Sequence, residues 1–129
     1  MPQTKIYGNI DFIQQNRETL SKTIHSCVVD ALNYPPEKKF QRFFPLHAED
    51  FEYPSDRTQR YIIIEILLFE GRSIAAKKSL YQLLFERLKD KLDIASLDVE
   101  IILIETPRHN WGIRGVAGDE LELNYKANV

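Results

Sequence analysis

Two similar arrangements of hydrophobic residues follow one another along the chain, and together they constrain the fold more than any single motif. In the first, alternating residues at 3–9 predict a short strand, and apolar residues at three- and four-residue steps from about Phe12 to Leu32 predict a helix. The stretch NYPPEKKF at 33–40 ends this helix, because two consecutive prolines cannot continue it. The aromatic segment 39–46 predicts another strand, which Pro45 restricts to a sheet edge or a strand end.

The second arrangement repeats this order after an acidic, polar loop at 47–58. RYIIIEILLFE at 60–70 predicts an interior strand, because it is rich in β-branched and aliphatic residues. Ser73 is placed to cap a second helix that runs through about Leu92, and 98–106 predicts a last strand. The apolar stripe that we expect this helix to bury consists of Ile74, Leu80, Leu83, Leu84, Leu88 and Leu92.

The repeated order of strand, helix and strand predicts an α+β fold made of duplicated β-α-β units. The parallel strands of each unit require a right-handed helical crossover, so we expect one four-stranded sheet with two helices on one face. No predicted helix is left for the other face, although YIIIEILLF at 61–69 offers apolar side chains to both sides. A partner subunit is the natural cover for that face, and we therefore expect an oligomer.

The remaining tail, residues 108–129, reads RHNWGIRGVAGDELELNYKANV. It contains too much glycine for a helix, and Leu121, Leu123 and Tyr125 alternate with polar residues near its end. We expect this tail to form a C-terminal hairpin, or a strand that is exchanged with a neighbouring subunit and lines its edge.

Size and charge exclude several classes of function. With 129 residues and 43% hydrophobic residues, the chain is expected to fold as a single domain that spans 1–129. A net charge of −2 gives no reason to expect nucleic acid or an anionic membrane as partner. The apolar run 61–69 is interrupted by Glu65 and is far shorter than the ~20 residues of a membrane span. The single Cys27 and the lack of a secretory signal favour a cytoplasmic protein.

Common motifs for cofactors and metals are missing from the sequence. It has no Walker loop, no G-x-G-x-x-G and no paired cysteines, so we expect no nucleotide cofactor. His25, His47 and His109 have no ligand partner three or four residues away, so we expect no metal. A four-stranded sheet with two helices is also the build of RNA-recognition domains, but the strand at 60–70 lacks the aromatic residues that such domains use.

Four features at particular points of the duplicated frame carry a family resemblance. They are Pro2 at the start of the first strand, His25 in the first helix, EGRS with Arg72 after the third strand, and NWGIRG at 110–115. The chain resembles the tautomerase superfamily, specifically the longer-chain branch that contains malonate semialdehyde decarboxylase and cis-3-chloroacrylic acid dehalogenase. This resemblance implies two pseudo-symmetric β-α-β halves, a homotrimer, and an amino-terminal proline at each site.

The resemblance also implies a role for each matched residue. Pro2, once Met1 is removed, is expected to act as general base and general acid, since burial and nearby cations lower the pKa of its amine towards about 7. Arg72 is expected to bind the carboxylate of a small enol or keto acid, for which its planar fork is suited. The expected substrate-binding residues are His25, Trp111, Ile113 and Arg114.

Two departures from the branch bear on the reaction. Lys38 stands where the decarboxylases carry an acid, and Phe69 or Glu70 stands where they carry a second arginine. These losses disfavour decarboxylation, hydration and dehalogenation. Keto–enol tautomerisation requires only a base and a cation for the enolate oxygen, and we expect an isomerase of this kind. The alternative is a family member that keeps the trimer, has lost the chemistry and binds a small ligand.

Overall fold

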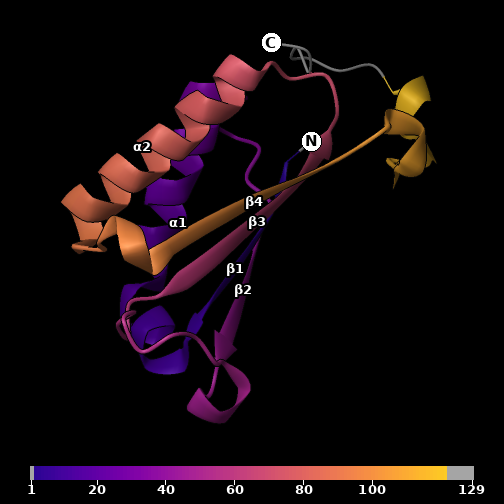
Figure 1. Cartoon of the computed structure of the whole chain (residues 1–129). Coiled ribbons are helices and arrows are strands. Elements are labelled where there is room, and N and C mark those ends of the chain that lie inside the picture. The colour runs from indigo at the N-terminus through magenta and orange to yellow at the C-terminus, as the bar shows by residue number, and fades with distance from the viewer. Residues whose placement is uncertain (1, 122–129) are drawn as a thin grey trace.

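The structure, a computed structural model, describes residues 2–121 and contains one four-stranded sheet covered by two long helices (Figure 1). The sheet order is β2-β1-β3-β4, with β1 and β2 parallel, β3 and β4 parallel, and the central pair β1 and β3 antiparallel. The bounds are β1 Gln3–Asn9, α1 Ile10–Leu32, β2 Gln41–Leu46, β3 Ile62–Phe69, α2 Ile74–Leu92 and β4 Val99–Thr106. The predicted α+β fold of duplicated β-α-β units is thus confirmed.

The two β-α-β units pair their strands in the same register. In β1 and β2, Lys5 pairs with Arg42, and in β3 and β4, Glu65 pairs with Ile102. Equivalent positions of the two units therefore differ by 60 in number (5 and 65, 42 and 102). The two halves have the same order of strand, helix and strand. Because the equivalent residues Lys5 and Glu65 pair in antiparallel strands, a two-fold rotation relates one half to the other.

The helices repeat with the same spacing and supply most of the core. The buried residues that correspond between α1 and α2 are Leu20 and Leu80, Ile24 and Leu84, Val28 and Leu88, and Leu32 and Leu92. They recur every four residues along one stripe, which packs against the sheet. Both helices end at a residue in the left-handed conformation, Asn33 with φ 49° and Asp93 with φ 54°. Burial of each leucine side chain contributes about 1.5–3 kcal/mol.

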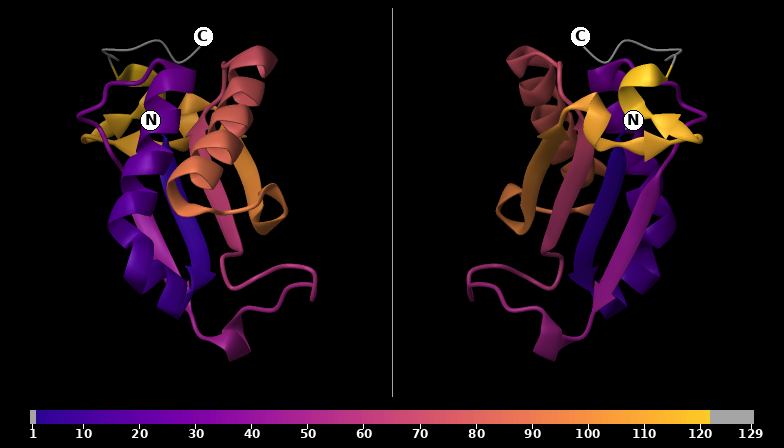
Figure 2. Two further views of the ribbon diagram at one scale, coloured as in Figure 1. Left: turned by 90° about the vertical axis from the view of Figure 1, so that its left-hand side faces the viewer. Right: turned by 90° about the vertical axis from the view of Figure 1, so that its right-hand side faces the viewer.

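Both helices lie on the same face of the sheet. Figure 2 shows them in front of the strands in its left view and behind the strands in its right view. The opposite face carries apolar side chains that stay accessible, with Phe44 36%, Ile102 46% and Ile104 38% exposed. At its centre, the Tyr7 hydroxyl donates to Glu65 Oε1 at 2.6 Å, and this hydrogen bond raises the pKa of Tyr7. Part of the predicted uncovered face is therefore apolar, and its middle is polar.

Local sequence signals were confirmed at two points and were wrong at one. Ser73 caps α2, because its hydroxyl accepts the amide of Ala76 at 3.1 Å, and Pro45 lies on the edge strand β2. Ile74, which we expected on the buried stripe, is 70% exposed. It is the first residue of α2 and lies six residues before Leu80, so it stands at the end of the helix, before the leucines that pack into the core.

The residues after β4 form a small hairpin beyond the end of the sheet (Figure 1). A 3-10 turn, η3 Arg108–Asn110, leads into β5 Gly112–Ile113 and β6 Val116–Ala117, which pair antiparallel. The two residues between these strands, Arg114 and Gly115, both have positive φ (53° and 82°), as a type I′ turn requires. The hairpin expected in the tail is present, whereas Leu123 and Tyr125 lie outside the described residues.

Candidate active site

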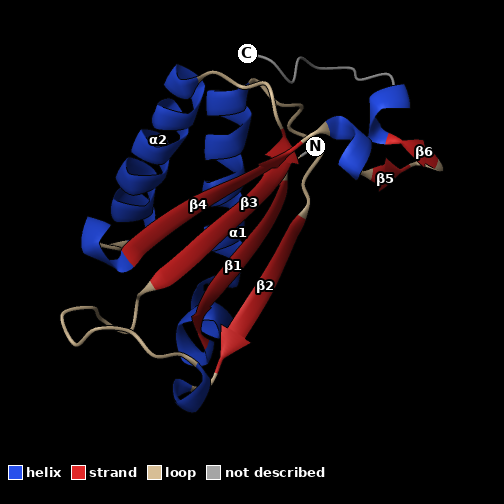
Figure 3. Cartoon of the chain, turned by 45° about the vertical axis from the view of Figure 1, so that its right-hand side comes forward, coloured by secondary structure: helices blue, strands red, loops and turns tan. Residues whose placement is uncertain are grey.

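One end of the sheet gathers most of the residues that the sequence singled out (Figure 3). Because β1 and β3 are antiparallel, Gln3 pairs with Leu67, and Pro2 precedes Gln3 at the end of the sheet where β3 finishes. Since β3 and β4 are parallel, Phe69 pairs with Thr106, the last residue of β4. The start of β1, the loop to α2 and the hairpin after β4 therefore share this end. Pro2 itself is buried.

Arg72 lies in the short loop between β3 and α2. Its side chain belongs to the buried polar set, with 5% of the residue exposed, and Nη1 donates to the carbonyl oxygen of Phe69 at 3.3 Å. Ser73 follows it as the cap of α2, so Arg72 lies at the amino end of a 19-residue helix. The guanidinium charge and the positive end of the helix dipole both favour an anion here.

Trp111 lies at the same end of the sheet, in the segment that follows β4. Its indole N–H donates to Thr106 Oγ1 at 2.6 Å, and its ring meets the ring of Phe69 edge-on at 5.1 Å between centroids. Phe69 is completely buried. The indole is therefore fixed where β3 and β4 end. The loop that carries Arg72 begins at the same end of β3.

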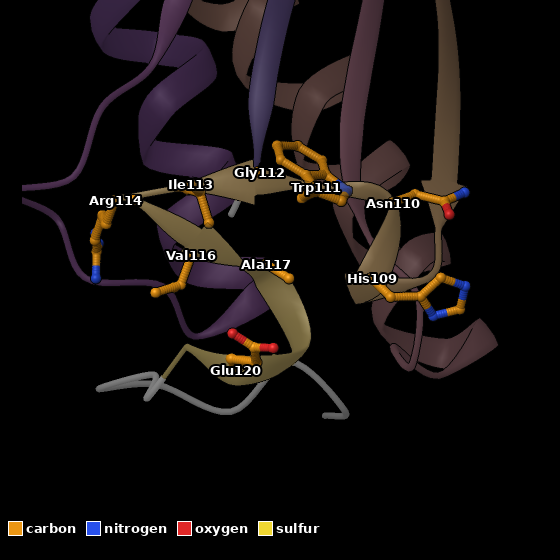
Figure 4. Close-up of a pocket in the computed structure, with 10 residues that line it drawn as sticks. His109, Asn110, Trp111, Gly112, Ile113, Arg114, Val116, Ala117 and Glu120 are labelled. Atoms are coloured by element: carbon orange, nitrogen blue, oxygen red, sulfur yellow. The ribbon is translucent and has the colours of Figure 1, made fainter.

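The hairpin surrounds an open hollow of about 830 Å³ (Figure 4). Trp111, Ile113 and Arg114 all contribute to its lining, together with His109 and Glu120. Among the residues that the structure describes, Pro2 and Arg72 do not line this hollow. The six candidate residues thus fall into separate groups: three belong to the hairpin, two, Pro2 and Arg72, lie at the end of the sheet beside it, and His25 lies on α1.

His25 has a different environment. Ser21, one turn earlier on α1, donates to Gln41 at the start of β2 at 2.6 Å, so this part of the helix lies beside the edge strand. The Nε2 atom of His25 lies 2.7 Å from the carbonyl oxygen of Pro36, in the loop between α1 and β2. The structure accounts for His25 as a contact between helix and loop, and its role in substrate binding stays a prediction.

Sequence reasoning missed two residues at this end of the molecule. Phe69 was counted as part of a strand and as one of two residues in place of a second arginine, yet its ring is in contact with Trp111. Arg108 was passed over, although it follows β4 after a single proline and lies two residues before the motif NWGIRG that carried the resemblance. Its position between a strand end and Trp111 was the signal that marked it.

Lys38 stands where the decarboxylases carry an acid, but the equivalent position in the other half of this chain is acidic. Position 98, which is 60 residues further on, is Asp98, and this residue is only 3% exposed. Its carboxylate accepts the amide and the hydroxyl of Thr58 at 2.8 and 2.5 Å. Asp98 precedes β4 and therefore lies at the end of the sheet opposite to Pro2, where it fastens the loop before β3.

Residues 2–121 contain no group of three or more His, Cys, Asp or Glu side chains arranged to hold a metal ion. Neither of the helices in this range is both long and apolar enough to cross a membrane.

Comparison with known proteins identifies the family. A sequence model of the family described as "Tautomerase enzyme" matches residues 38–114. The chain belongs to this tautomerase family. The probable tautomerase YusQ of Bacillus subtilis is 28% identical over 99 residues, which cover 73% of this chain and 78% of that protein. A 2-hydroxymuconate tautomerase of Pseudomonas putida is 33% identical over 57 residues, which cover 44% of this chain and 90% of that protein.

Solved structures of the superfamily share the fold. Native fused 4-OT superposes with a TM-score of 0.82 at 18% identity, covering 92% of this chain and 98% of that chain. Malonate semialdehyde decarboxylase gives a TM-score of 0.77 at 19% identity and covers 86% of this chain and 89% of that one. A fused 4-OT described as an asymmetric trimer gives 0.81 at 19% identity, with 92% and 97% covered. The family match confirms the resemblance expected from the sequence motifs, and the solved structures confirm the fold.

Proposed function

We propose that this protein is a tautomerase in which the amine of Pro2, freed by removal of Met1, moves a proton between the oxygen and the carbon of a small enol or keto acid. The observation that carries this proposal is the strand register, since Gln3 pairs with Leu67 at the end of the sheet where Arg72 and Trp111 also lie. Membership of the tautomerase family and the printed activity of the Pseudomonas relative support it.

The proposed reaction needs no group beyond the amine and a cation. The neutral prolyl nitrogen takes the proton of the enol hydroxyl, and the electron pair left on oxygen forms the C=O bond. The electron pair of the C=C bond then takes a proton at carbon from the same nitrogen, which returns to its neutral form. Arg72 binds the carboxylate of the substrate, and its positive charge lowers the pKa of the prolyl amine by disfavouring the protonated form.

Substitution of the two residues tests this mechanism. We expect Pro2→Ala and Arg72→Ala each to lower kcat/KM for phenylenolpyruvate by about a hundredfold or more. The intact mass of the wild-type preparation must first show that Met1 is absent, because an acylated nitrogen cannot act as a base. Equal rates in wild type and Pro2→Ala would remove Pro2 from the mechanism.

A second candidate, a ligand-binding member without chemistry, is favoured by two departures from the decarboxylases: Lys38 stands where they carry an acid, and Phe69 or Glu70 stands where they carry a second arginine. This alternative predicts no turnover of phenylenolpyruvate or of 2-hydroxymuconate by protein that lacks Met1. It also predicts that a carboxylate ligand still raises the melting temperature and that Arg72→Ala abolishes this shift. Turnover by the wild type would reject it.

We also propose that the open face of the sheet is covered in a homotrimer, because Ile102 and Ile104 are accessible there and related folds are described as trimers. Ile102→Asp is expected to lower the mass measured by light scattering. Leu97→Asp is the matched control, since Leu97 is also exposed (52%) but lies outside the sheet. An unchanged mass in Ile102→Asp, or an equal loss in both variants, would contradict this assignment.

A further inference from the structure

We propose that Arg108 is a positioning residue, which fastens the hairpin to the buried end of β3 and thereby holds Trp111 against the site. The consequence for catalysis rests on the proposed tautomerase function, whereas the positioning itself does not. Arg108 is the first residue of η3 and follows β4 after a single proline, Pro107. Its side chain is half-buried.

Two hydrogen bonds connect Arg108 to the far side of the hairpin. Nε donates to the carbonyl oxygen of Gly118 at 3.0 Å, and Nη2 donates to the carbonyl oxygen of Leu121 at 2.6 Å. Both acceptors follow β6, so one side chain connects the residue before the hairpin to the residues after it. A guanidinium suits this task, because its rigid fork directs several donors at once and stays charged.

A backbone contact completes the link from Arg108 to Trp111. The amide of Gly118, whose carbonyl Arg108 binds, donates to the carbonyl oxygen of Trp111 at 2.7 Å. Hydrogen bonds therefore hold both the amide and the carbonyl of Gly118. A larger residue does not fit at this position, since a Cβ there would lie 2.3 Å from the carbonyl oxygen of Arg108. Any movement of Gly118 away from Arg108 is thus transmitted to the main chain of Trp111.

Arg108 and Trp111 also share one aromatic partner. The guanidinium carbon of Arg108 lies 5.5 Å from the ring centroid of Phe69, within the range of a cation–π contact. The indole of Trp111 lies 5.1 Å from the same ring. Because Phe69 is completely buried, it provides a fixed surface for both side chains.

The other half of the molecule shows that the fold alone does not require this arginine. Its equivalent turn, η1 Ala48–Asp50, lies 60 positions earlier and has Ala48 in place of Arg108. The residue equivalent to Phe69 is Asn9, whose amide donates instead to the Tyr53 hydroxyl and the Gln59 carbonyl, each at 3.0 Å. The 3-10 turn therefore forms without an arginine at its first position, and the arginine stands there only in the half whose turn leads into the hairpin.

Fluorescence tests the positioning directly, because Trp111 is the single tryptophan of the chain. We expect Arg108→Ala to shift the emission to longer wavelength and to raise acrylamide quenching by about twofold, while far-UV circular dichroism is unchanged. Arg108→Lys is expected to restore part of the protection, because lysine keeps the charge but lacks the fork.

The matched control is Arg60→Ala. Arg60 makes the same two kinds of contact at the opposite end of the sheet, a hydrogen bond to the Leu92 carbonyl at 2.7 Å and a cation–π contact with Phe12 at 5.5 Å. We expect Arg60→Ala to leave the emission of Trp111 unchanged. Wild-type emission and quenching in Arg108→Ala, or equal changes in both variants, would overturn the proposal.

The kinetic readout separates this proposal from the proposed function. In Arg108→Ala we expect KM for phenylenolpyruvate to rise about tenfold with a smaller change in kcat, because Pro2 and Arg72 lie on elements that the hairpin does not contain. The pH profile of kcat/KM should keep its wild-type shape. A kcat loss at constant KM would overturn the positioning role. If the wild type shows no turnover, the proposed function fails, and the fluorescence result still decides the role of Arg108.

Discussion

Gly118→Ala is the substitution whose effect follows most directly from the structure. A Cβ at position 118 would lie 2.3 Å from the carbonyl oxygen of Arg108 and 3.1 Å from Cβ of Trp111. Real Cβ atoms essentially never come closer than 3.0 Å to a heavy atom, so the main chain must move by at least about 0.7 Å. The atom in the way belongs to the backbone of η3, and a change of rotamer cannot remove it.

The movement disrupts the two hydrogen bonds that hold Gly118. These are its amide bond to the Trp111 carbonyl at 2.7 Å and the bond from Arg108 Nε to its own carbonyl at 3.0 Å. Each contributes about 0.5–1.5 kcal/mol, so the expected loss is about 1–3 kcal/mol. This loss falls on the hairpin, which opens locally, while the sheet and the two helices keep their stability.

Hydrogen exchange of the segment 108–121 measures this opening. We expect faster exchange in Gly118→Ala by about five- to a hundredfold, and faster tryptic cleavage after Arg114 at the tip of the hairpin. Gly112→Ala is the matched control, because a Cβ at that glycine of β5 meets nothing within 4 Å. Wild-type exchange in Gly118→Ala, or equally fast exchange in Gly112→Ala, would refute the reasoning.

Three further predictions concern other contacts. Burial, with a smaller effect of Glu100, raises the pKa of Tyr61 from 10.0 to about 12. The folded state therefore favours the neutral hydroxyl. Its contribution to the free energy of unfolding is complete below pH 10 and is lost as the pH rises towards 12. Urea titrations should show that Tyr61→Phe lacks this pH dependence. Asp98→Ala should lower the free energy of unfolding by about 1–3 kcal/mol, because the Thr58 amide loses its buried acceptor. Arg114→Gly should stabilise the hairpin by about 1 kcal/mol, seen as slower exchange, since glycine adopts positive φ without strain. Unchanged stability in Asp98→Ala or unchanged exchange in Arg114→Gly would contradict these two assignments.

Periodicity in the sequence was enough to predict the sheet and the helices. The four-residue spacing of Leu80, Leu84, Leu88 and Leu92 reflects the same physical requirement that the structure shows, a continuous apolar stripe towards the sheet. Proline and serine signals also acted locally, as Pro45 and Ser73 demonstrate. Ile74 was assigned wrongly because hydrophobicity alone does not show that it is the first residue of α2, ahead of the buried leucines, where it is exposed.

Contacts between distant segments could not be predicted in the same way. Asn9 is the N-cap residue of α1, yet its side chain makes no cap hydrogen bond; its amide donates to Tyr53 and Gln59, which a loop brings to it from more than 40 positions away. Arg108 lies over Phe69 only because the pairing of β3 with β4 places their ends together. The candidate site is assembled by such pairing, and the sequence supplied its residues without their arrangement.

The central claim is that the amine of Pro2 carries the proton, and the most direct test changes only whether that amine is free. Protein that retains Met1 should be prepared, its intact mass verified, and its rate of phenylenolpyruvate tautomerisation measured before and after treatment with a methionine aminopeptidase. The account predicts that kcat/KM rises by about a hundredfold or more in step with the loss of Met1. The same rate before and after removal would contradict it.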